Sequence, residues 1–556
     1  MKMKKLATLL LAAAMLTTGF AGCKNSDSGS KDTEGGIKEF TAFYAVPGTE
    51  INDDNEIQAK IAEITGATCK ETWLTGQTAS EAIGTMIAGG EYPDFIDGSD
   101  GTAALYDAGA LVALDEYLES GDYPNLTKFW SEAEWDKVRQ DDGHIYWIPQ
   151  FGNPYEKSMA TDPAEAFWIQ TRVLKWADYP KIETVDEYFK LLEDYNKANP
   201  TMEDGTENIP FTILCDDWRY FCLENPPQFL DGYPNDGSVI VDPDTKKIID
   251  YNTTDTAKRY FQKLNEEYHK GIVDPESFTQ SYDEYIAKLS TGRVLGMVDQ
   301  KWQFQQVYDT IKQQGLSEEG CNFVPLGIRI DKDTPNQWQS EDAINVANGV
   351  GISVSCKDVE GALKFLNDLL SPEVRILRGW GIEGVDYEVG EDGVFTRTDE
   401  QWANVSNASY KASHMCPYSY MPNYTGVLED GINASDPNQQ PTEFYKSLPA
   451  DVQECLSAYD CETYSEMCGP INPVPGPWFP MYSFSNTMTT STPGGTAWTK
   501  MGEVKHEQLP KVVMSSDFEK GWSEYMAAYN ECKPEDFLKE MQEELDRRIE
   551  EAAKHE

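Results

Sequence analysis

Hydrophobic and polar positions at the start of the globular sequence switch between the spacing of strands and that of helices. They predict strand 39–45, helix 57–64, strand 67–74, helix 79–88 and a short apolar strand within 89–97, entered through Gly and Pro. Strands that alternate with helices in this way indicate a largely parallel sheet with helices on its faces. The loops that follow parallel strands gather at one edge of the sheet, and open α/β sheets bind ligands there.

Capping motifs and amphipathic spacing predict the elements further along the chain. Thr184 and Glu187 have the spacing of a capping box before an apolar run, and Ser281 and Glu284 repeat it. Other predicted elements are helix 254–270, strand 349–354, helix 359–370 and two closing helices over 518–529 and 537–549. The segment 401–495 is rich in Pro, Tyr, Asn and Ser and is predicted to be mostly irregular.

The first 22 residues have the pattern of an export signal. Lys2, Lys4 and Lys5 give a basic start, residues 6–16 are uncharged and mostly Leu and Ala, and small residues lead to Cys23. The apolar run is shorter than the roughly 20 residues that a membrane-spanning helix needs. We therefore exclude residues 1–22 from the fold as a signal peptide.

Ala21-Gly22-Cys23 resembles the end of a bacterial lipobox, in which the Cys is diacylated and becomes the first mature residue. Phe20 stands where that pattern usually has Leu, and the alternative is an ordinary secretory signal cut near Ala21. Two acyl chains anchor a protein stably to a membrane. Residues 23–38 lack apolar periodicity after the Cys and predict a lipid-anchored flexible tether.

Composition narrows the class of protein. The chain has 556 residues, enough for two to four domains, and its formal net charge of −49 repels phosphate backbones, so a nucleic-acid partner is not expected. Aromatic residues make up 12% of the chain, too many for a disordered protein. The 11 Cys form no C-x-x-C pair, which argues against zinc-ribbon and thioredoxin motifs and leaves their redox state open.

Six phrases in order along about 350 residues resemble one family, the extracellular solute-binding proteins of bacterial ABC importers, in the long lipoprotein branch associated with carbohydrate uptake. The phrases are 87–94 (IAGGEYPD), 109–117 (GALVALDEY), 142–149 (DGHIYWIP), 184–195, 271–276 (GIVDPE) and 380–387 (WGIEGVDY). His144 and Trp147 depart from the third phrase, where the family usually has Lys and Gly.

The resemblance implies a two-lobed, periplasmic-binding-protein-like (type II) α/β fold, in which each lobe is a mostly parallel sheet flanked by helices and a hinge joins the lobes. Crossings are expected near Pro149 and Gly349. The expected division is 39–149 and 350–400 for the first lobe, and 150–349 and 401–556 for the second. The implied protein is a monomer that captures a carbohydrate between its lobes and delivers it to membrane permease subunits.

A carbohydrate site needs aromatic platforms for the C–H faces of the sugar and polar side chains for its hydroxyls. Single Trp residues are more often core than platform, so position along the chain selects the candidates. The residues at strand ends, at the expected crossing and in suitable loops are Tyr44, Asp97, Trp147, Asp217, Trp218, Trp302, Trp338, Trp380 and Glu383.

Enzyme motifs are absent from the sequence: it has no G-x-S-x-G, no Walker loop and no H-E-x-x-H. Residues 379–384 fit G-x-G-x-x-G but follow a predicted helix, so we interpret them as a helix-ending turn. The many Asp and Glu residues are compatible with the pair of catalytic carboxylates that a glycosidase uses, although no short motif singles out such a pair. The alternatives are therefore a surface enzyme acting on polysaccharide, or a receptor for a non-sugar ligand such as a peptide.

An oxygen-rich loop gives one weak candidate for a structural Ca²⁺ site; otherwise no cofactor is expected. The possible ligands are Asn199, Thr201, Glu203 and Glu207, at alternating positions that resemble a calcium loop found in some relatives. In this chain Asp204-Gly205 is one residue out of register with that loop. The other interpretation is a polar turn between a helix and a strand.

Overall fold

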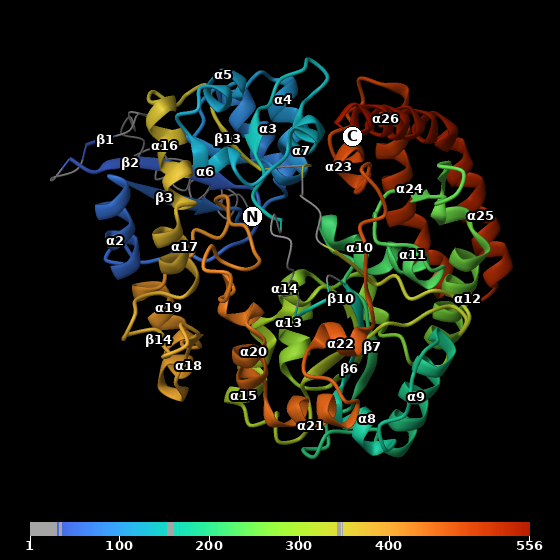
Figure 1. Cartoon of the computed structure of the whole chain (residues 1–556). Helices are drawn as coiled ribbons and strands as arrows, with labels where there is room; N and C mark the ends of the chain where they lie inside the picture. Colours follow the sequence, from blue (N-terminus) through green and yellow to red (C-terminus); the bar gives the residue numbers. More distant parts are fainter. Residues whose placement is uncertain are drawn as a thin grey trace, which may run out of the picture.

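The computed structural model of the chain describes residues 31–32, 36–152, 161–163, 165–341, 346 and 349–555. The predicted export signal, Cys23 and most of the predicted tether lie outside these residues. The described chain forms two lobes of mixed α/β structure, with the blue and yellow segments in one and the green and red segments in the other (Figure 1). No described helix is both long and apolar enough to cross a bilayer.

The first lobe is built on a six-stranded sheet. Its order is β1 (Lys31–Asp32), β2 (Lys38–Tyr44), β4 (Phe95–Asp97), β13 (Val350–Ile352) and β5 (Trp147–Ile148), with β3 (Ala67–Trp73) on the other side of β2. The three strands predicted at the start of the globular sequence, β2, β3 and β4, run parallel to one another. β13 is antiparallel to both β4 and β5.

The second lobe is built on a four-stranded sheet, in the order β11 (Phe323–Leu326), β6 (Ala166–Gln170), β10 (Val294–Asp299) and β7 (Ile209–Thr212). Only the pair of β10 and β7 is parallel in this sheet. Both sheets are therefore mixed rather than mostly parallel, because strands next to the lobe crossings enter their sheets in the opposite direction. Three two-stranded ribbons complete the strands: β8 (Ile240–Val241) with β9 (Ile248–Ile249), β12 (Gln339–Ser340) with β16 (Ile471–Asn472), and β14 (Glu388–Val389) with β15 (Phe395–Thr396).

Helices cover both sheets, and most of the predicted ones are present. The first lobe has α2 (Glu56–Thr65), α3 (Ala79–Gly89), α4 (Thr102–Asp107), α5 (Asp115–Glu119), α6 (Pro124–Thr127), α7 (Glu132–Val138), α16 (Val359–Leu369), α17 (Pro372–Gly379), α18 (Asp399–Val405) and α19 (Ala408–His414). The second has α8 (Thr171–Trp176), α9 (Val185–Ala198), α10 (Phe221–Glu224), α11 (Pro226–Leu230), α12 (Asp255–His269), α13 (Tyr282–Ser290), α14 (Lys301–Phe304), α15 (Gln306–Gln313) and α20 to α26. Both predicted capping boxes form, at the starts of α9 and α13.

The segment 401–495 is more helical than predicted. It contains most of α18, then α19, α20 (Pro441–Ser447), α21 (Ala450–Ala458), α22 (Tyr464–Cys468) and α23 (Tyr482–Ser485). The prediction also missed α24 (Pro493–Met514), whose Gly494, Gly495 and Pro510 are residues that sequence rules place outside helices. Packing against α12, α25 (Phe518–Glu531) and α26 (Pro534–His555) overrides these propensities.

Each lobe has its own hydrophobic core. The core of the first lobe includes Cys416, Tyr418, Met421 and Tyr424, so the chain stays with that lobe beyond residue 400, where the sequence had placed the boundary. Burial of these large side chains against α2 and the first sheet accounts for the difference. The ten described Cys are all free thiols, and eight are buried among apolar side chains.

Crossing segments lie side by side where the chain passes between the lobes. The backbone N–H groups of Asn423 and Thr425 donate to the carbonyl oxygens of Gln150 and Gly152, at 2.8 and 3.0 Å. The Tyr424 hydroxyl also donates to the Pro149 carbonyl, at 2.9 Å. Two strand-like segments held by few hydrogen bonds can bend without disturbing either core, as a hinge requires.

Candidate functional site

Two tryptophans stack at one edge of the second sheet. Trp218 lies in the 3₁₀ turn η2 (Asp217–Tyr220) after β7, and Trp302 lies in α14 after β10. Because β7 and β10 are parallel neighbours, both loops emerge at the same edge. The ring centroids are 5.8 Å apart with planes inclined by 8°, and Trp302 is 49% exposed. Both rings were predicted, and the structure brings them together.

Arg219 lies beside this pair and is held by aromatic faces rather than by a carboxylate. Its guanidinium carbon is 4.6 Å from the centre of the Trp218 ring and 4.2 Å from that of Tyr282. The side chain is only 6% exposed, and its Nε has no hydrogen-bond partner among the described residues. A buried donor without an acceptor is costly, which marks Arg219 as a residue whose hydrogen bonding the described fold does not complete.

A chain of hydrogen bonds connects the exposed Trp302 ring to the buried carboxyl group of Glu165. The Trp302 indole N–H donates to Gln300 Oε1 at 2.6 Å, and Gln300 Nε2 donates to Glu165 Oε2 at 3.4 Å. Glu165 is fully buried, and burial raises its pKa to about 8, although hydrogen bonds from Asn225 and Gln300 oppose the shift. At neutral pH this chain of contacts therefore ends on a mostly protonated carboxyl group.

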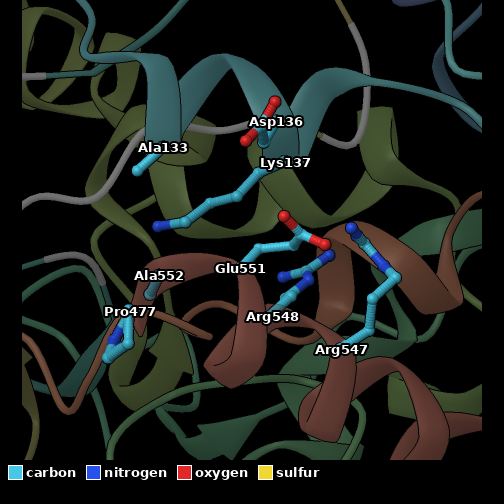
Figure 2. Close-up of a pocket in the computed structure, with 8 residues that line it drawn as sticks. All are labelled: Ala133, Asp136, Lys137, Pro477, Arg547, Arg548, Glu551 and Ala552. Carbon is cyan, nitrogen blue, oxygen red and sulfur yellow. The ribbon is translucent and has the colours of Figure 1, made fainter. Parts of the chain in front are cut away.

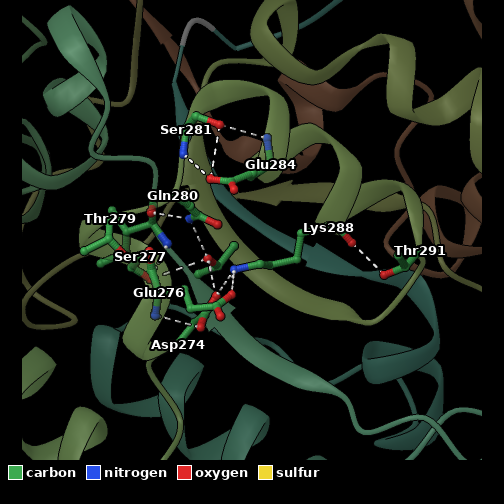
Figure 3. Close-up of polar contacts among 11 residues, drawn as sticks. Asp274, Glu276, Ser277, Thr279, Gln280, Ser281, Glu284, Lys288 and Thr291 are labelled. Atoms are coloured by element: carbon green, nitrogen blue, oxygen red, sulfur yellow. Dashed lines mark hydrogen bonds and ion pairs between the residues drawn. The ribbon is translucent and has the colours of Figure 1, made fainter. Parts of the chain in front are cut away.

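Figure 3 shows a polar network that anchors the loop carrying Trp218. Asp274, just before the 3₁₀ turn η4 (Pro275–Phe278), accepts from Lys288 at 2.6 Å and from Thr212, the last residue of β7, at 3.0 Å. Gln280 Nε2 donates to the Ile213 carbonyl at 2.8 Å, and Ser277 Oγ accepts from the Ile213 N–H at 3.0 Å. These bonds fix the chain immediately before the loop that carries Trp218.

Two first-lobe carboxylates lie near this surface: Asp100 is exposed, whereas the predicted site residue Asp97 is only 2% exposed. Asp97 ends β4 directly opposite Tyr44 of β2, and its Oδ1 accepts from the Ser99 N–H at 2.8 Å. Burial raises the pKa of Asp97 to about 6, against a hydrogen bond from Gln150. Asp100, in the next turn, keeps an exposed surface, but the surrounding protein desolvates it and raises its pKa to about 6.

The charges of the two lobes act on each other across this region. Asp217 further raises the pKa of Asp100, and Arg219 lowers it. Arg219 also opposes the rise in the pKa of Tyr420, which burial and then Asp97 bring to about 12. The carboxylates of lobe one and the Trp218 loop of lobe two are therefore close enough to act on each other electrostatically.

Aromatic residues line the first-lobe side next to the hinge. Tyr420 lies with its ring centroid 5.5 Å from that of Tyr44 and 5.4 Å from that of Trp73. Phe151, 37% exposed on the crossing segment, meets Tyr420 edge-on at 5.5 Å. Tyr44 itself is fully buried, and its hydroxyl donates to Glu71 at 2.9 Å. Tyr44 therefore supports the site from beneath and presents no face to it.

Three of the tryptophans predicted as ligand-binding platforms lie in hydrophobic cores instead. Trp147, Trp338 and Trp380 are at most 2% exposed, and their indole N–H groups donate to the carbonyls of Val346, Ile328 and Ala434. A ring packed on both faces, with its N–H satisfied by backbone, has no surface left for a ligand. Glu383 is exposed, but it lies in the turn beside the Trp380 cluster, next to Tyr387.

The sequence did not single out Asp100, Arg219, Tyr282, Phe151 and Tyr420. Asp100 and Arg219 follow predicted site residues by one to three positions, and Phe151 follows the predicted crossing, so a wider window at those points would have included them. Tyr420 lies in the segment predicted as irregular and has no local signal, because only the fold brings it to Tyr44.

The calcium candidates occupy a tight polar turn. Thr201 pairs with Glu207 as an antiparallel bridge, and the Met202 N–H donates to the Thr206 carbonyl at 2.8 Å. Asp204 points its carboxylate to the Thr206 N–H at 2.8 Å, which is a hydrogen bond within the turn. Across the described ranges, no three His, Cys, Asp or Glu side chains gather closely enough to hold a metal ion.

The lobes also meet at a second place, shown in Figure 2, where they enclose a cavity that is too small for a typical organic ligand. Lys137 of α7 and Arg548 and Glu551 of α26 line a cavity of about 50 Å³. Ligand pockets typically measure about 300–1,000 Å³. Burial and the nearby Arg548 lower the pKa of Lys137.

Comparison with known proteins identifies the family. The family model described as bacterial extracellular solute-binding protein matches residues 59–377, and the chain belongs to this family. It is 25% identical over 449 residues to "Lipoprotein LipO" of Bacillus subtilis (strain 168), covering 77% of this chain and 81% of that one. It is 24% identical over 405 residues, or 68% of this chain and 71% of the other, to "Fructooligosaccharide ABC transporter substrate-binding protein FusA" of Streptococcus pneumoniae serotype 4 (strain ATCC BAA-334 / TIGR4).

A solved structure supports the two-lobed fold. The solute-binding protein of Bifidobacterium longum infantis ATCC 15697, described as binding HMO and associated with an ABC transporter, aligns with a TM-score of 0.63. The alignment covers 91% of this chain and 98% of that one at 13% sequence identity, so it speaks for the fold alone.

Proposed function

We propose that this solute-binding protein captures an oligosaccharide between its lobes and delivers it to the membrane subunits of an ABC importer. The observation that carries the proposal is the stacked pair of Trp218 and Trp302 with the buried, unpaired Nε of Arg219 at its side. Aromatic faces suit the C–H faces of sugar rings, and the facing carboxylates suit hydroxyl donors. The name of the relative FusA, a fructooligosaccharide-binding protein, agrees with this ligand class.

Lobe closure is the working step of the proposed cycle. In the open form, the ligand binds to the surface formed by the stacked rings of Trp218 and Trp302. The hinge near Gln150 and Asn423 then bends, and Asp97 and Asp100 approach from the other lobe. Permease subunits then recognise the closed form. The ligand favours closure only as far as it contacts both lobes at once.

Titration calorimetry with a panel of oligosaccharides tests the proposal. We expect one glycan to bind with a stoichiometry of one per chain. Failure of every glycan to bind, together with tight binding of peptides, would refute the carbohydrate assignment. A receptor also releases no reducing ends from polysaccharide, whereas the competing enzyme function would.

We further propose that Cys23 carries the lipid anchor that holds the protein at the outer face of the cell membrane. The lipobox-like sequence supports this, and the resemblance to a relative named as a lipoprotein agrees with it. Mass spectrometry of the mature N-terminal peptide should find a diacylglycerol modification on Cys23. Cleavage near Ala21 with an unmodified Cys would instead support an ordinary secretory signal.

A further inference from the structure

We infer that Tyr420 is a ligand contact of the first lobe and that the buried Arg378 is the residue that positions it. The inference rests on the proposed function and deepens it, because the stacked rings of Trp218 and Trp302 belong to the second lobe alone. A ligand favours closure only through contacts with both lobes, so the first lobe needs a contact of its own.

Tyr420 has the features of such a contact. Its ring is partly exposed and meets those of Tyr44, Trp73 and Phe151 at centroid distances of 5.5, 5.4 and 5.5 Å. Its hydroxyl is not enclosed and has no hydrogen-bond partner among the described residues, whereas the Tyr44 hydroxyl donates to Glu71. A tyrosine offers an apolar face to the C–H groups of a sugar and a hydroxyl to its oxygens.

The position of Tyr420 next to the crossing between the lobes suits this role. Its carbonyl oxygen accepts from Gln150 Nε2 at 2.5 Å, and the Gln150 carbonyl accepts from the Asn423 N–H at 2.8 Å. Phe151, the next residue on the crossing segment, is 37% exposed. The aromatic group therefore has an accessible side at the point where the lobes join.

The segment that carries Tyr420 does not hold itself in place. Within residues 416–424, all of them described, the one backbone–backbone hydrogen bond runs from the Met421 N–H to the Tyr418 carbonyl, at 2.9 Å. Tyr418 has a left-handed conformation, with φ of +45°, although it is not glycine. Such a conformation persists where the surrounding structure enforces it, so the placement of this segment depends on other parts of the fold.

Arg378 of α17 supplies the donors that the segment needs. Its Nε donates to the Pro417 carbonyl at 2.8 Å. Its Nη1 donates to the Pro422 carbonyl at 2.8 Å, and its Nη2 donates to the Tyr418 carbonyl at 2.9 Å. Carbonyl groups on both sides of Tyr420 are therefore fixed to one guanidinium, and this fixes where the ring between them lies.

The contacts of Arg378 require an arginine. The side chain is 3% exposed, so a ligand does not touch it, and burial lowers its pKa to about 10. It makes no ion pair with a carboxylate in the described part of the chain. A planar fork with five N–H donors reaches carbonyls in several directions, whereas lysine has its three donors on a single nitrogen.

A double-mutant cycle tests the inference by calorimetry on the full chain, with the oligosaccharide of the panel that binds wild type most tightly. Tyr420→Ala should weaken binding by roughly 10- to 100-fold. Arg378→Lys should weaken it about tenfold in the wild-type background, but less than about twofold further in the Tyr420→Ala background, because its effect passes through that ring. A merely structural role would not make the loss of affinity depend on Tyr420.

Arg172→Lys is the matched control. Arg172 also uses its guanidinium to hold a backbone carbonyl, that of Gly292, at 2.9 Å. Gly292 precedes β10, whereas Trp302 follows it, so this contact lies at the other end of the strand from the stacked rings. The variant should lower the free energy of unfolding and leave the affinity unchanged.

If Arg378→Lys does not fold, Tyr418→Phe takes its place in the cycle, because it removes a hydroxyl that anchors the same turn to the Cys69 N–H at 3.2 Å. Unchanged affinity in Tyr420→Ala overturns the inference. A positioning variant that has no effect, or an equal effect in both backgrounds, overturns it as well. Failure of every oligosaccharide to bind wild type is a different result, since it refutes the proposed function itself.

Discussion

At the scale of single residues, the candidate site includes residues whose backbone conformations most residues avoid. Asp217 and Ser99 both have left-handed backbone conformations, with φ of +51° and +47°, although neither is glycine. Such conformations are costly and persist where the surrounding structure enforces them. Ser99 begins the 3₁₀ turn that contains Asp100, and Asp217 begins the turn that contains Trp218, so each directly precedes a residue of the candidate site.

Trp302→Ala should weaken oligosaccharide binding by roughly 10- to 100-fold, because a half-exposed platform contributes to a bound ligand more than to the fold. Trp176→Ala is the matched control: Trp176 is 47% exposed in the same lobe, on α8, and its ring meets Tyr195. Calorimetry on both variants checks this. A comparable loss of affinity in both would contradict the role of Trp302.

Glu165→Gln should stabilise the protein at high pH. The folded pKa of about 8 lies above the usual value of 4.5, so the folded state holds a proton that the unfolded state has released, and stability falls as pH rises from about 4.5 to 8. The amide resembles the protonated acid and escapes this loss. The gain should be near zero at pH 4.5 and reach on the order of 4 kcal/mol above pH 8.

Urea unfolding of wild type and Glu165→Gln across this pH range measures the effect. A difference in free energy of unfolding that does not grow with pH would show that Glu165 ionises normally in the folded chain.

The sequence placed side chains well where position follows from chain order, and less well where packing decides. Trp218 and Trp302 lie together, as chain order suggests, because each follows a predicted strand and parallel strands place such loops together. Trp147, Trp338 and Trp380 follow comparable patterns but face inward. Which way a ring points depends on the sheet it packs against, and local sequence does not carry that information.

At the scale of elements, the turn formed by the GIVDPE phrase has a definite structural role: it is hydrogen-bonded to the end of β7, just before the loop that carries Trp218. Asp274 and Lys288 are nearly buried, with side chains 7% and 11% exposed, and Asp274 also accepts from Thr212. The capping box at Ser281 then starts α13 with Tyr282 against Arg219. The sequence predicted this helix but not its link to Arg219.

Asp274→Asn should lower the free energy of unfolding by about 3 kcal/mol, because Lys288 is left buried without its closest carboxylate. Glu276→Gln is the control, since Glu276 pairs with the same Lys288 at 3.1 Å but is 70% exposed. Its loss should be within about 1 kcal/mol. Equal losses in chemical denaturation would contradict the network's role in holding β7.

At the scale of the whole molecule, the order of strands and helices in the first lobe follows the predicted pattern, whereas the mixed sheets and α24 do not. Sheet direction at the crossings depends on how the chain passes between lobes, and α24 depends on burial against three other helices. Contacts between the lobes also occur away from the hinge. They include α7 against α26, an exposed Lys411–Asp309 pair at 4.0 Å, and hydrogen bonds from the Arg397 N–H and the Trp402 indole to Glu443 of α20.

A hinge between two lobes with separate cores permits one lobe to rotate against the other. Small-angle X-ray scattering should show a smaller radius of gyration when a binding oligosaccharide is added to the wild-type protein. The Trp302→Ala variant at the same sugar concentration should stay close to the unliganded value. A bound wild-type protein with unchanged dimensions would mean that binding does not close the lobes.

A crystal structure of the protein with its oligosaccharide tests the central claim most directly. The account predicts a sugar ring against the Trp218–Trp302 surface, with sugar oxygens bonded to Arg219 and hydroxyls to carboxylates of the first lobe. A ligand bound elsewhere, or one that contacts neither tryptophan, would contradict it.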